Sequence, residues 1–424
     1  MKLSLKNIGK IKEGIVEING ITIIAGVNNT GKSTVGKTLY SIFNSFYNIE
    51  SQIKKERVQI VENLLDMMYR NSTNRLTSRV DTFDIAENII DNINNYLSQP
   101  EMLKNEIMNS IIQYDENFEK VLANENDIIN ETIKRIMETI NVSSEEIFKT
   151  VLNKKLDSEF NGQINNIFSD DKGTIELQIK DYIVKINLVD NNVTDITNKV
   201  DLKTEAIYID DPFVLDEARV IPYLMRFKNY PDHKSHLKSK LISKNDNNVI
   251  NEIIATKKFD NIYSKINLVC GGDVVNSRRT GLGYKRTNTE KILDIRNLST
   301  GLKTFVVLKT LLVNGVIEFN GTIILDEPEI HLHPEWQLLF AELIVLIQKE
   351  FGMHVLLNTH SPYFLRAIEI YSAKHGIADK CKYYLSVLKE DDAYIQDVSD
   401  DIESIYQKLS APFQALENER WSDD

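Results

Sequence analysis

The sequence has few of the features that would place the protein outside the cell or in a membrane. Only two cysteines, Cys270 and Cys381, occur in 424 residues, so a disulfide framework is excluded. No signal peptide precedes the first expected strand at 2–5. The longest apolar helical stretch, around 338–347, is too short to span a membrane and is interrupted by Glu342. We therefore expect a cytoplasmic protein with no membrane segment.

The sequence also lacks an excess of positive charge. Its formal net charge is −12, which argues against a surface wholly devoted to nucleic acid, because phosphate contacts supply most of that affinity. Two local basic runs remain, namely Arg226, Lys228, His233, Lys234, His236, Lys238, Lys240 and Lys244, and then Arg278, Arg279, Lys285, Arg286 and Lys291. Aromatic residues are interleaved with them, namely Tyr223, Phe227, Tyr230 and Tyr284. Solvated faces are the usual explanation, and a nucleic-acid groove with base stacking is the alternative.

The first functional motif is a glycine-bearing loop between an apolar strand pattern and a helix pattern. Ile21 to Ala25 form the apolar run, and the pattern G-x-x-x-x-G-K-S follows it. The glycines let backbone N–H groups turn inward around a polyphosphate, the lysine reaches the β- and γ-phosphates, and the serine can bind Mg²⁺. An incidental turn is the alternative. We predict that ATP and Mg²⁺ bind to Gly26, Asn28, Asn29, Thr30, Gly31, Lys32, Ser33 and Thr34.

Three further motifs follow in the second half of the chain. The segment 297–303 contains Ser299 and Gly301 before an apolar helix pattern. The strand pattern of 321–327 ends in Asp326 and Glu327, and that of 354–359 delivers His360. Because ligands of parallel α/β sheets gather at the carboxyl ends of strands, we expect Lys32, the two acids and the histidine to converge on one nucleotide.

These motifs together resemble those of the ABC-type ATPases of the OLD, SMC and RecF kind. The run from Asp326 to Pro334 is especially similar to that of the stand-alone ATPases of bacterial phage-defence modules such as Septu and PARIS. The resemblance covers about 1–50 and 200–370. It implies an α/β fold: an ABC-type P-loop ATPase head, with a mixed sheet flanked by helices, and an inserted helical or short coiled-coil lobe.

The resemblance also implies a role for each motif residue. Lys32 would contact phosphate, Ser33 would bind Mg²⁺, and Asp326 would contact the ion directly or through its water. Glu327 would orient the attacking water, and His360 would sense the γ-phosphate. Positioning and charge neutralisation are what phosphoryl transfer requires. The alternatives are a helix N-terminal acid for Glu327 and a core histidine for His360.

The segment around Ser299 and Gly301 would contact the γ-phosphate of a second subunit, which implies a homodimer or a higher homo-oligomer. Two departures from transporter cassettes occur here. The signature reads L-S-T-G-L-K instead of L-S-G-G-Q, and His333-Pro334 replaces an aspartate. His331 and His333 could suggest a metal site, but structural or interface roles fit better, because no further ligands are near.

The chain is longer than one ordinary domain and 42% hydrophobic, so it can bury a large core. We expect three segments: the N-terminal part of the head at 1–50, a helical insertion at 51–170 and the rest of the head at 171–424. The insertion contains a capping box at Ser143 and Glu146. It also has an apolar stripe, which comprises Ile107, Ile111, Phe118, Val121, Ile128, Ile133, Ile136 and Ile140. This stripe would bind a partner, or it would pack within the lobe or against a second copy of the chain.

Other segments predict strands. A small antiparallel sheet is expected at 174–179, 182–189 and 193–197, another strand at 206–210, and two strands with a final helix after 381. The glutamine of the Q-loop is not identified, since Gln178 lies inside the antiparallel run.

The sequence leaves three functions open. We favour an ATP-hydrolysing switch or sensor that controls a separate effector, a nuclease or toxin, in phage defence or a toxin–antitoxin-like module. The first alternative is a DNA-repair or DNA-clamping ATPase of the RecF or SMC kind, and the second is an ATP-binding scaffold with negligible turnover. Only 361–424 follows His360, which is too short for the TOPRIM nuclease of OLD proteins, so we expect no nuclease activity of its own.

Overall fold

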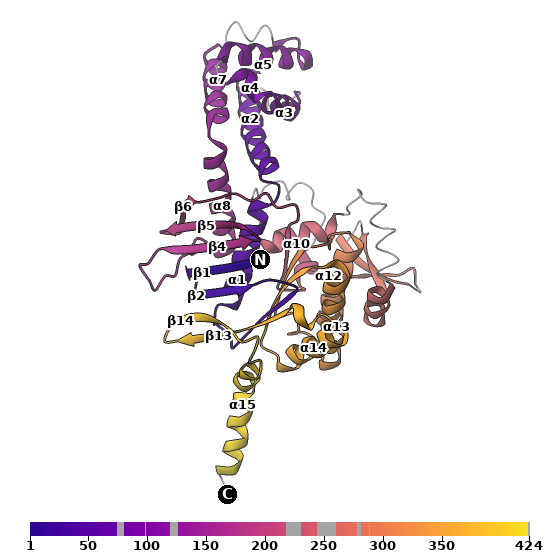
Figure 1. The fold of residues 1–424 in the computed structure, drawn as a ribbon. Coiled ribbons are helices and arrows are strands. Elements are labelled where there is room, and N and C mark those ends of the chain that lie inside the picture. Colours follow the sequence, from indigo (N-terminus) through magenta and orange to yellow (C-terminus); the bar gives the residue numbers. More distant parts are fainter. Residues whose placement is uncertain are drawn as a thin grey trace. The chain divides into compact units, whose positions relative to one another are not determined.

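The computed structural model describes residues 1–73, 80–97, 99–118, 126–217, 230–243, 260–277, 281–287 and 289–422. These residues form two compact units (Figure 1). Unit 1 comprises Met1–Tyr47 and Leu152–Asp424, and unit 2 comprises Asn48–Val151. Among the described helices, none is both long enough and apolar enough to cross a membrane.

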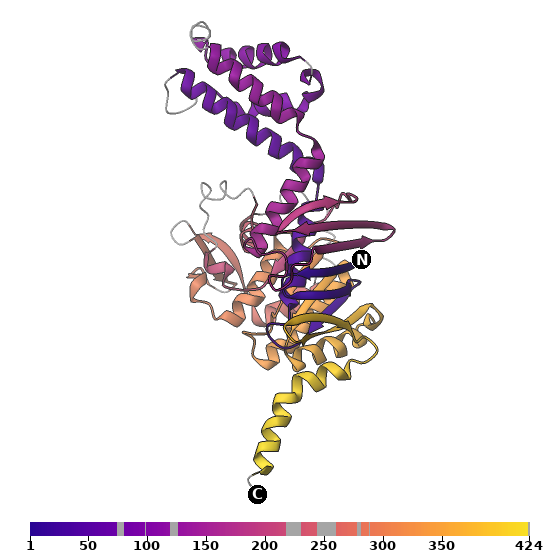
Figure 2. The ribbon, with the colours of Figure 1, turned by 90° about the vertical axis from the view of Figure 1, so that its left-hand side faces the viewer.

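Unit 1 is built on an eleven-stranded mixed sheet of order β6-β5-β4-β1-β2-β14-β13-β3-β12-β11-β7. Its strands are β1 (Lys2–Ile8), β2 (Ile11–Glu17), β3 (Ile21–Ala25), β4 (Gly173–Ile179), β5 (Tyr182–Val189), β6 (Asn192–Ile196), β7 (Ala206–Ile209), β11 (Thr322–Asp326), β12 (His354–Thr359), β13 (Cys381–Lys389) and β14 (Asp392–Asp397). The predicted small antiparallel sheet is therefore not separate, because β4 pairs with β1 and continues the main sheet (Figure 2).

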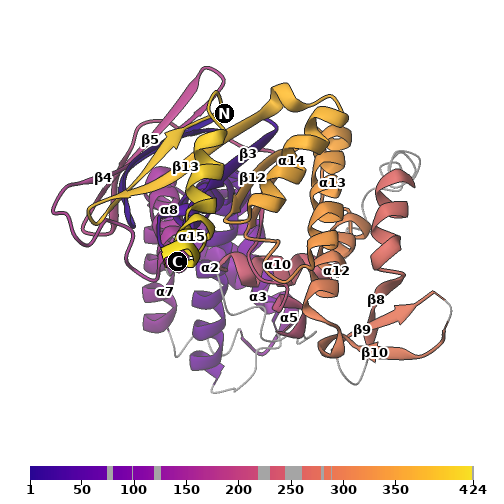
Figure 3. The ribbon, with the colours of Figure 1, turned by 90° about the horizontal axis from the view of Figure 1, so that it is seen from below.

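The segment β13-β3-β12-β11-β7 is parallel, and helices cover both of its faces. The helices of unit 1 include α1 (Lys32–Phe46), α9 (Val214–Glu217), α10 (His233–Ile242), a helix at 260–269, α12 (Thr300–Val313), α13 (Pro334–Phe351), α14 (Pro362–Lys374), α15 (Glu403–Ser422) and two short 3₁₀ turns, η2 (Ile295–Asn297) and η3 (Ala378–Lys380). Side chains alternate along each strand, so Ile323 and Leu325 join the core with α12, α13 and α14, whereas Ile324 and Tyr208 face Gly36 of α1. Figure 3 shows α13 and α14 side by side.

A second, three-stranded antiparallel sheet of order β10-β9-β8 also belongs to unit 1. It contains β8 (Gly272–Ser277), β9 (Gly281–Arg286) and β10 (Ile292–Asp294). Cys270, just before β8, and Cys381 are both buried and unpaired, as the composition predicts.

Unit 2 is helical. It contains α2 (Ile49–Thr73), α3 (Thr82–Asp91), α4 (Ile93–Tyr96), α5 (Pro100–Tyr114), α7 (Asn126–Asn141) and the start of α8 (Ser144–Phe160). The predicted capping box at the start of α8 is confirmed, because Ser143 Oγ accepts the N–H of Glu146 at 3.1 Å and the Glu146 carboxylate faces the N–H of Ser143 at 3.4 Å.

The apolar stripe of unit 2 packs inside the unit. Ile107, Ile111, Phe118 and Ile136 are fully buried, in one cluster with Val61 and other residues of α2. Ile133 and Ile140 are buried there too, Ile128 is partly buried, and Val121 lies outside the described residues. The structure therefore supports packing within the lobe and not an exposed binding stripe.

The second boundary of the helical insertion differs from the predicted one at 170. Unit 2 ends at Val151, because the residues that follow bond to unit 1. Asn153 Oδ1 accepts the N–H of Val193 at 2.7 Å, and Glu159 holds His233. Helix α8 thus begins in unit 2 and ends in unit 1.

Helix α13 carries one buried acid in an otherwise apolar face. The carboxylate of Glu342 is held by two lysines, Lys265 at 2.7 Å and Lys374 at 3.1 Å, and by the imidazole of His375 at 3.2 Å. Burial alone would raise the pKa of Glu342, but these hydrogen bonds outweigh it and lower the pKa to about 2. The acid that interrupts the apolar pattern is therefore fully partnered.

We predict that Glu342→Gln lowers the free energy of unfolding by about 2 kcal/mol at pH 7, because it leaves Lys265 and Lys374 without their anion. Since the folded pKa lies below the ordinary value of 4.5, this contribution is present above about pH 4.5 and is lost as the pH falls toward 2. Urea unfolding at pH 7 and pH 4 measures it. Glu350→Gln, on the same helix and without an ion pair in the described structure, is the control; equal losses in both variants would contradict the prediction.

Candidate functional site

The loop between β3 and α1 has the backbone that its glycines predict. Gly31 has a φ of 85° and Asn29 a φ of 63°, both left-handed. A Cβ at Gly31 would lie 2.8 Å from Ile11 Cγ1, and a Cβ at Gly26 would lie 2.6 Å from the carbonyl oxygen of Ser386. Larger residues are therefore excluded at both glycines by strain or by contact.

This loop borders a cavity of about 430 Å³. Its lining brings together the predicted phosphate loop and the acids at the end of β11. The lining residues are Lys10, Asn28, Asn29, Thr30, Gly31, Lys32, Ser33, Thr34, Asp210, Asp326, Glu327 and Ile330. Sequence reasoning missed Lys10, on the turn between β1 and β2, and Asp210, at the end of β7. We name this cavity the phosphate pocket.

Lys32 is the buried cation of the phosphate pocket, with only 4% of its side chain exposed. Its Nζ donates to the carbonyl oxygens of Gly26 and Val27, both at 3.0 Å, and lies 3.3 Å from Glu327 Oε1. The side chain thus joins the loop to the end of β11.

Asp326 is held on both carboxylate oxygens. The hydroxyl of Tyr208 donates to Oδ2 at 2.7 Å, and the amide of Asn358 donates to Oδ1 at 3.0 Å. Gly36 lets the tyrosine reach this position, because a Cβ there would lie 3.2 Å from the Tyr208 hydroxyl. Burial and the neighbouring Asp326 raise the pKa of Tyr208 well above its ordinary value, so it acts as a neutral donor.

Glu327 turns the chain at the end of β11 with a left-handed φ of 50°. Its N–H donates to the carbonyl oxygen of Asn358 at 2.9 Å, and its Oε1 lies 3.4 Å from Nδ1 of His360. Glu327 therefore lies between Lys32 and His360, at the edge where β11, β12 and β3 end together.

Glu329 is a buried acid that supports this edge. Its Oε1 accepts hydrogen bonds from Thr359 Oγ1 at 2.5 Å and from the N–H of His360 at 3.3 Å. Burial raises its pKa, although the bond from Thr359 opposes this effect. Glu329 thus fixes the backbone from which His360 projects.

Ser299 and Gly301 do not line the phosphate pocket of their own chain. Ser299 begins α12, and a Cβ at Gly301 would lie 2.9 Å from the carbonyl oxygen of His331 and 3.3 Å from the ring of Trp336. Lys303 of the same motif is buried and pairs with Asp216 at 2.7 Å. The described structure thus gives Gly301 and Lys303 packing roles within the chain.

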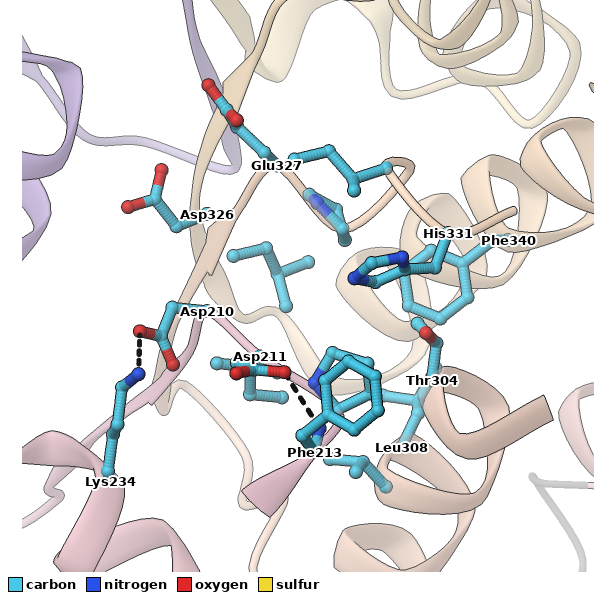
Figure 4. A pocket seen from close by; sticks show the side chains of 16 residues that line it. Asp210, Asp211, Phe213, Lys234, Thr304, Leu308, Asp326, Glu327, His331 and Phe340 are labelled. Carbon is cyan, nitrogen blue, oxygen red and sulfur yellow. Dashed lines mark hydrogen bonds and ion pairs between the residues drawn. The ribbon is translucent and has the colours of Figure 1, made fainter. Parts of the chain in front are cut away.

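A second cavity of about 330 Å³ adjoins the phosphate pocket (Figure 4). It lies between the end of β7, helix α12 and the chain that follows β11, and it shares Asp210, Asp326, Glu327 and Ile330 with the phosphate pocket. The ring of His331 borders it and packs edge-on against Phe213 at 5.8 Å. His333 begins α13, and its carbonyl oxygen accepts the N–H of Trp336.

Asp210 belongs to a buried ion network. Nε2 of His233 lies 3.0 Å from its Oδ2 and Nδ1 of the same ring lies 2.7 Å from Glu159 Oε2, while Lys234 Nζ lies 3.2 Å from the same Oδ2. The imidazole stacks on Tyr208 at 4.4 Å. Burial lowers the pKa of His233, but the bonds to Asp210 and Glu159 outweigh it and raise the pKa to about 9.

A family comparison decides what this arrangement belongs to. The family described as "AAA ATPase domain" matches residues 1–365, a range that contains the phosphate loop, both acids and His360. The chain belongs to this AAA ATPase domain family. It is accordingly an ATPase of the P-loop class.

Solved structures with a distant likeness to this AAA ATPase are heads of SMC proteins. The SMC head domain from Thermotoga maritima is 12% identical with a TM-score of 0.37, and the match covers 94% of this chain and 98% of that one. The Smc head domain with an extended coiled coil from Pyrococcus furiosus is 13% identical with a TM-score of 0.34, over 99% and 98%. The Smc head domain with a coiled coil and joint from Pyrococcus yayanosii is 11% identical with a TM-score of 0.37, over 97% and 99%.

The first basic run of this AAA ATPase is internally neutralised where the structure describes it. His233 and Lys234 pair as above, His236 and Lys240 share Glu205, and Lys238 pairs with Glu217. In the second run, Lys285 pairs with Glu290 at 2.8 Å.

The aromatic residues do not complete a stacking surface in the described structure. Tyr284 is buried, and the ring of Tyr230 lies under Lys154. Five basic residues and two aromatic residues fall outside the described residues, namely Arg226, Lys228, Lys244, Arg278, Arg279, Tyr223 and Phe227. The described ion pairs favour a structural role for the first run.

We predict that Tyr208→Phe lowers the free energy of unfolding by about 2 kcal/mol, because a buried oxygen of Asp326 loses its donor. Urea unfolding without nucleotide measures this loss. Tyr182→Phe is the control, because the side chain is 66% exposed. Identical unfolding midpoints for Tyr208→Phe and the unsubstituted protein would show that the bond contributes nothing.

Proposed function

We propose that this chain binds ATP with Mg²⁺ in the phosphate pocket, hydrolyses it, and uses the cycle as a switch that controls a separate effector. One observation carries the proposal: Lys32, Asp326, Glu327 and His360 come from three strand ends and meet at one edge of the sheet. The position of a carboxylate within 3.4 Å of both a buried lysine and an imidazole supports hydrolysis over a passive scaffold.

The residues of the phosphate pocket fit a nucleotide and its metal. Gly26 and Gly31 allow the loop backbone to approach a polyphosphate, and α1 directs its N-terminus toward it. Ser33 and Asp326 supply the oxygen atoms that Mg²⁺ prefers, and the bound ion would neutralise charge on the phosphate oxygens.

The remaining residues divide the catalytic work. Lys32 would contact the β- and γ-phosphates, and the Glu327 carboxylate would accept a hydrogen bond from the attacking water and orient it. His360 lies 3.4 Å from that carboxylate, and its contact with the γ-phosphate would affect the position of the carboxylate. Asn28, Asn29, Thr30 and Thr34 would shape the loop around the phosphates.

We further propose that Ser299 and Gly301 complete the phosphate pocket of a second copy of this chain. They lie outside the lining of their own pocket, and Ser299 stands at the N-terminus of the fourteen-residue helix α12. ATP would then hold two copies together, as a homodimer or within a larger homo-oligomer.

The effector would be a separate nuclease or toxin in the cytoplasm, and phage defence or a toxin–antitoxin-like module would be the setting. Support comes from the resemblance of the run Asp326 to Pro334 and from the described residues, which show no cluster of three metal-binding side chains. We accordingly expect no nuclease activity from this chain alone.

Lys32→Ala is expected to abolish ATP binding, because it removes the charge that faces the phosphates. Glu327→Gln is expected to bind ATP yet hydrolyse it at least about a hundredfold more slowly. Calorimetry and phosphate release measure the two effects, with the exposed Lys349→Ala and Glu335→Gln as matched controls. Unchanged ATP affinity in Lys32→Ala would refute the site, and unchanged turnover in Glu327→Gln would leave binding without the proposed catalytic role.

The shared site predicts a change of mass. Glu327→Gln with ATP is expected to shift toward dimers or larger assemblies, and added Ser299→Arg is expected to reverse the shift by placing a bulky cation at the junction. Light scattering with and without ATP compares the single and double variants. A constant mass in all four samples would reject the sharing of ATP between copies.

A further inference from the structure

Asp210 occupies the same level of the sheet as the acid that ends β11. Strands β7 and β11 are parallel, and Ile209 stands opposite Leu325, so the next residues, Asp210 and Asp326, leave neighbouring strands together. Figure 4 shows their two carboxyl groups pointing to the same side. Both residues line the phosphate pocket.

The lining of the phosphate pocket offers carboxylate oxygens to a cation near Asp210. Its lining contains Lys10 and Lys32 against three carboxylates, those of Asp210, Asp326 and Glu327. His233 and Lys234 offset the charge of Asp210, so the lining carries no excess of carboxylate, but a divalent ion beside Asp210 and Asp326 would attract both these carboxylates and the phosphates. Mg²⁺ bound with phosphates keeps several waters and needs only one or two carboxylates. Such a site does not require three protein ligands, and the described residues contain no cluster of three metal-binding side chains.

We propose that Asp210 is a further carboxylate of the Mg²⁺–nucleotide site, in contact with the ion directly or through its water, and that Glu159 positions it through His233. The inference deepens the proposed function, because it rests on ATP and Mg²⁺ binding in the phosphate pocket.

The geometry around His233 orients Asp210. Both cations that hold this carboxylate contact its Oδ2, which leaves Oδ1 without a partner among the described residues. On the other side of the ring, Glu159 bonds both to Nδ1 and to the backbone N–H of His233. Glu159 has only 1% of its side chain exposed, whereas Asp210 retains 25%. Glu159 is therefore buried at one end of the ion network, whereas Asp210 at the other end is partly exposed in the phosphate pocket.

Glu159 also ties the network to α8 and α1. Its carbonyl oxygen accepts a hydrogen bond from Lys37 of α1 at 3.3 Å, so the start of the helix after the phosphate loop contacts the end of α8. The chain re-enters unit 1 at Leu152, and Glu159 follows about two helical turns later. A displacement of the last turns of α8 would move Glu159, and through His233 it would alter the hold on Asp210.

A purely structural reading assigns Asp210 only to pairing with His233 and Lys234. The two readings differ in what they predict for metal binding. If Asp210 only neutralises two cations, its amide variant will change stability and leave metal affinity intact. If it faces the ion, the amide variant will lose metal affinity and keep metal-free nucleotide binding.

The first test uses Asp210→Asn and its neighbour Asp211→Asn as a matched control. Asp211 borders the second cavity but not the phosphate pocket, and its Oδ1 accepts the N–H of Phe213, a bond that asparagine can retain. Electron paramagnetic resonance measures Mn²⁺ binding to each protein with saturating ATP, and calorimetry measures ATP binding in EDTA. We expect Asp210→Asn to weaken Mn²⁺ binding roughly tenfold without weakening metal-free ATP binding, and Asp211→Asn to change neither.

The second test asks whether Glu159 acts through Asp210. Glu159→Gln is expected to weaken Mn²⁺ binding about threefold, and the loss should disappear when Asp210 is already asparagine. Asp210→Asn alone decides the metal assignment if Glu159→Gln does not fold, because Asp210 is partly exposed.

Three results would separate the hypotheses. Unchanged Mn²⁺ affinity in Asp210→Asn would overturn the inference, and an undiminished effect of Glu159→Gln in the double variant would overturn the positioning role. Failure of the unsubstituted protein to bind ATP would refute the proposed function itself.

Discussion

The parallel strands β3, β12, β11 and β7 set the geometry on which the site depends. Helices cover both faces of these strands, so almost every residue within them is apolar and buried. The polar groups of the site lie at the strand ends, except for the Tyr208 hydroxyl, which reaches Asp326 from within β7. The pairing register then decides which residues emerge together: Asp326 stands opposite Asn358, and Ala25, just before the phosphate loop, stands opposite Thr359. A slip of one residue would turn every side chain to the other face and dismantle the site.

Buried polar groups add precision to this register because each is costly unless it is partnered. Asn358 illustrates the effect, since its side-chain amide holds Asp326 while its carbonyl oxygen holds the backbone of Glu327. Glu329 likewise bonds to both the side chain of Thr359 and the backbone of His360. These bonds fix the relative positions of two strand ends that the apolar core alone would hold only by shape. The residues expected to contact ATP are therefore held in position by a second group of residues, which includes Asn358, Glu329 and Thr359.

The division between these two sets explains what the sequence could predict. Local patterns revealed the phosphate loop, the acid-terminated strand and the strand before His360, because each combines an apolar run with residues of special chemistry. Asp210 was not predicted as a site residue, although its strand was predicted. Its place in the phosphate pocket depends on the pairing of β7 with the distant β11. Lys10, on the turn between β1 and β2, was not predicted either, because only the folded chain brings this turn to the phosphate pocket. The joining of β4 to β1 and the return of α8 to unit 1 at Leu152 also arise from long-range contacts, which no periodicity encodes.

The segment 299–303 and the chain that follows β11 lie against each other in the structure. Gly301, in the altered signature, packs against the carbonyl oxygen of His331. Lys303 lies 5.0 Å from the centre of the Phe213 ring, which also packs edge to face with the ring of His331. Any motion of α12 relative to the end of β11 must therefore repack this lysine, phenylalanine and histidine together. Gly301, Lys303 and His331 are thus parts of one packed junction between helix α12 and the chain that follows β11, and a change in one should require compensation in the others.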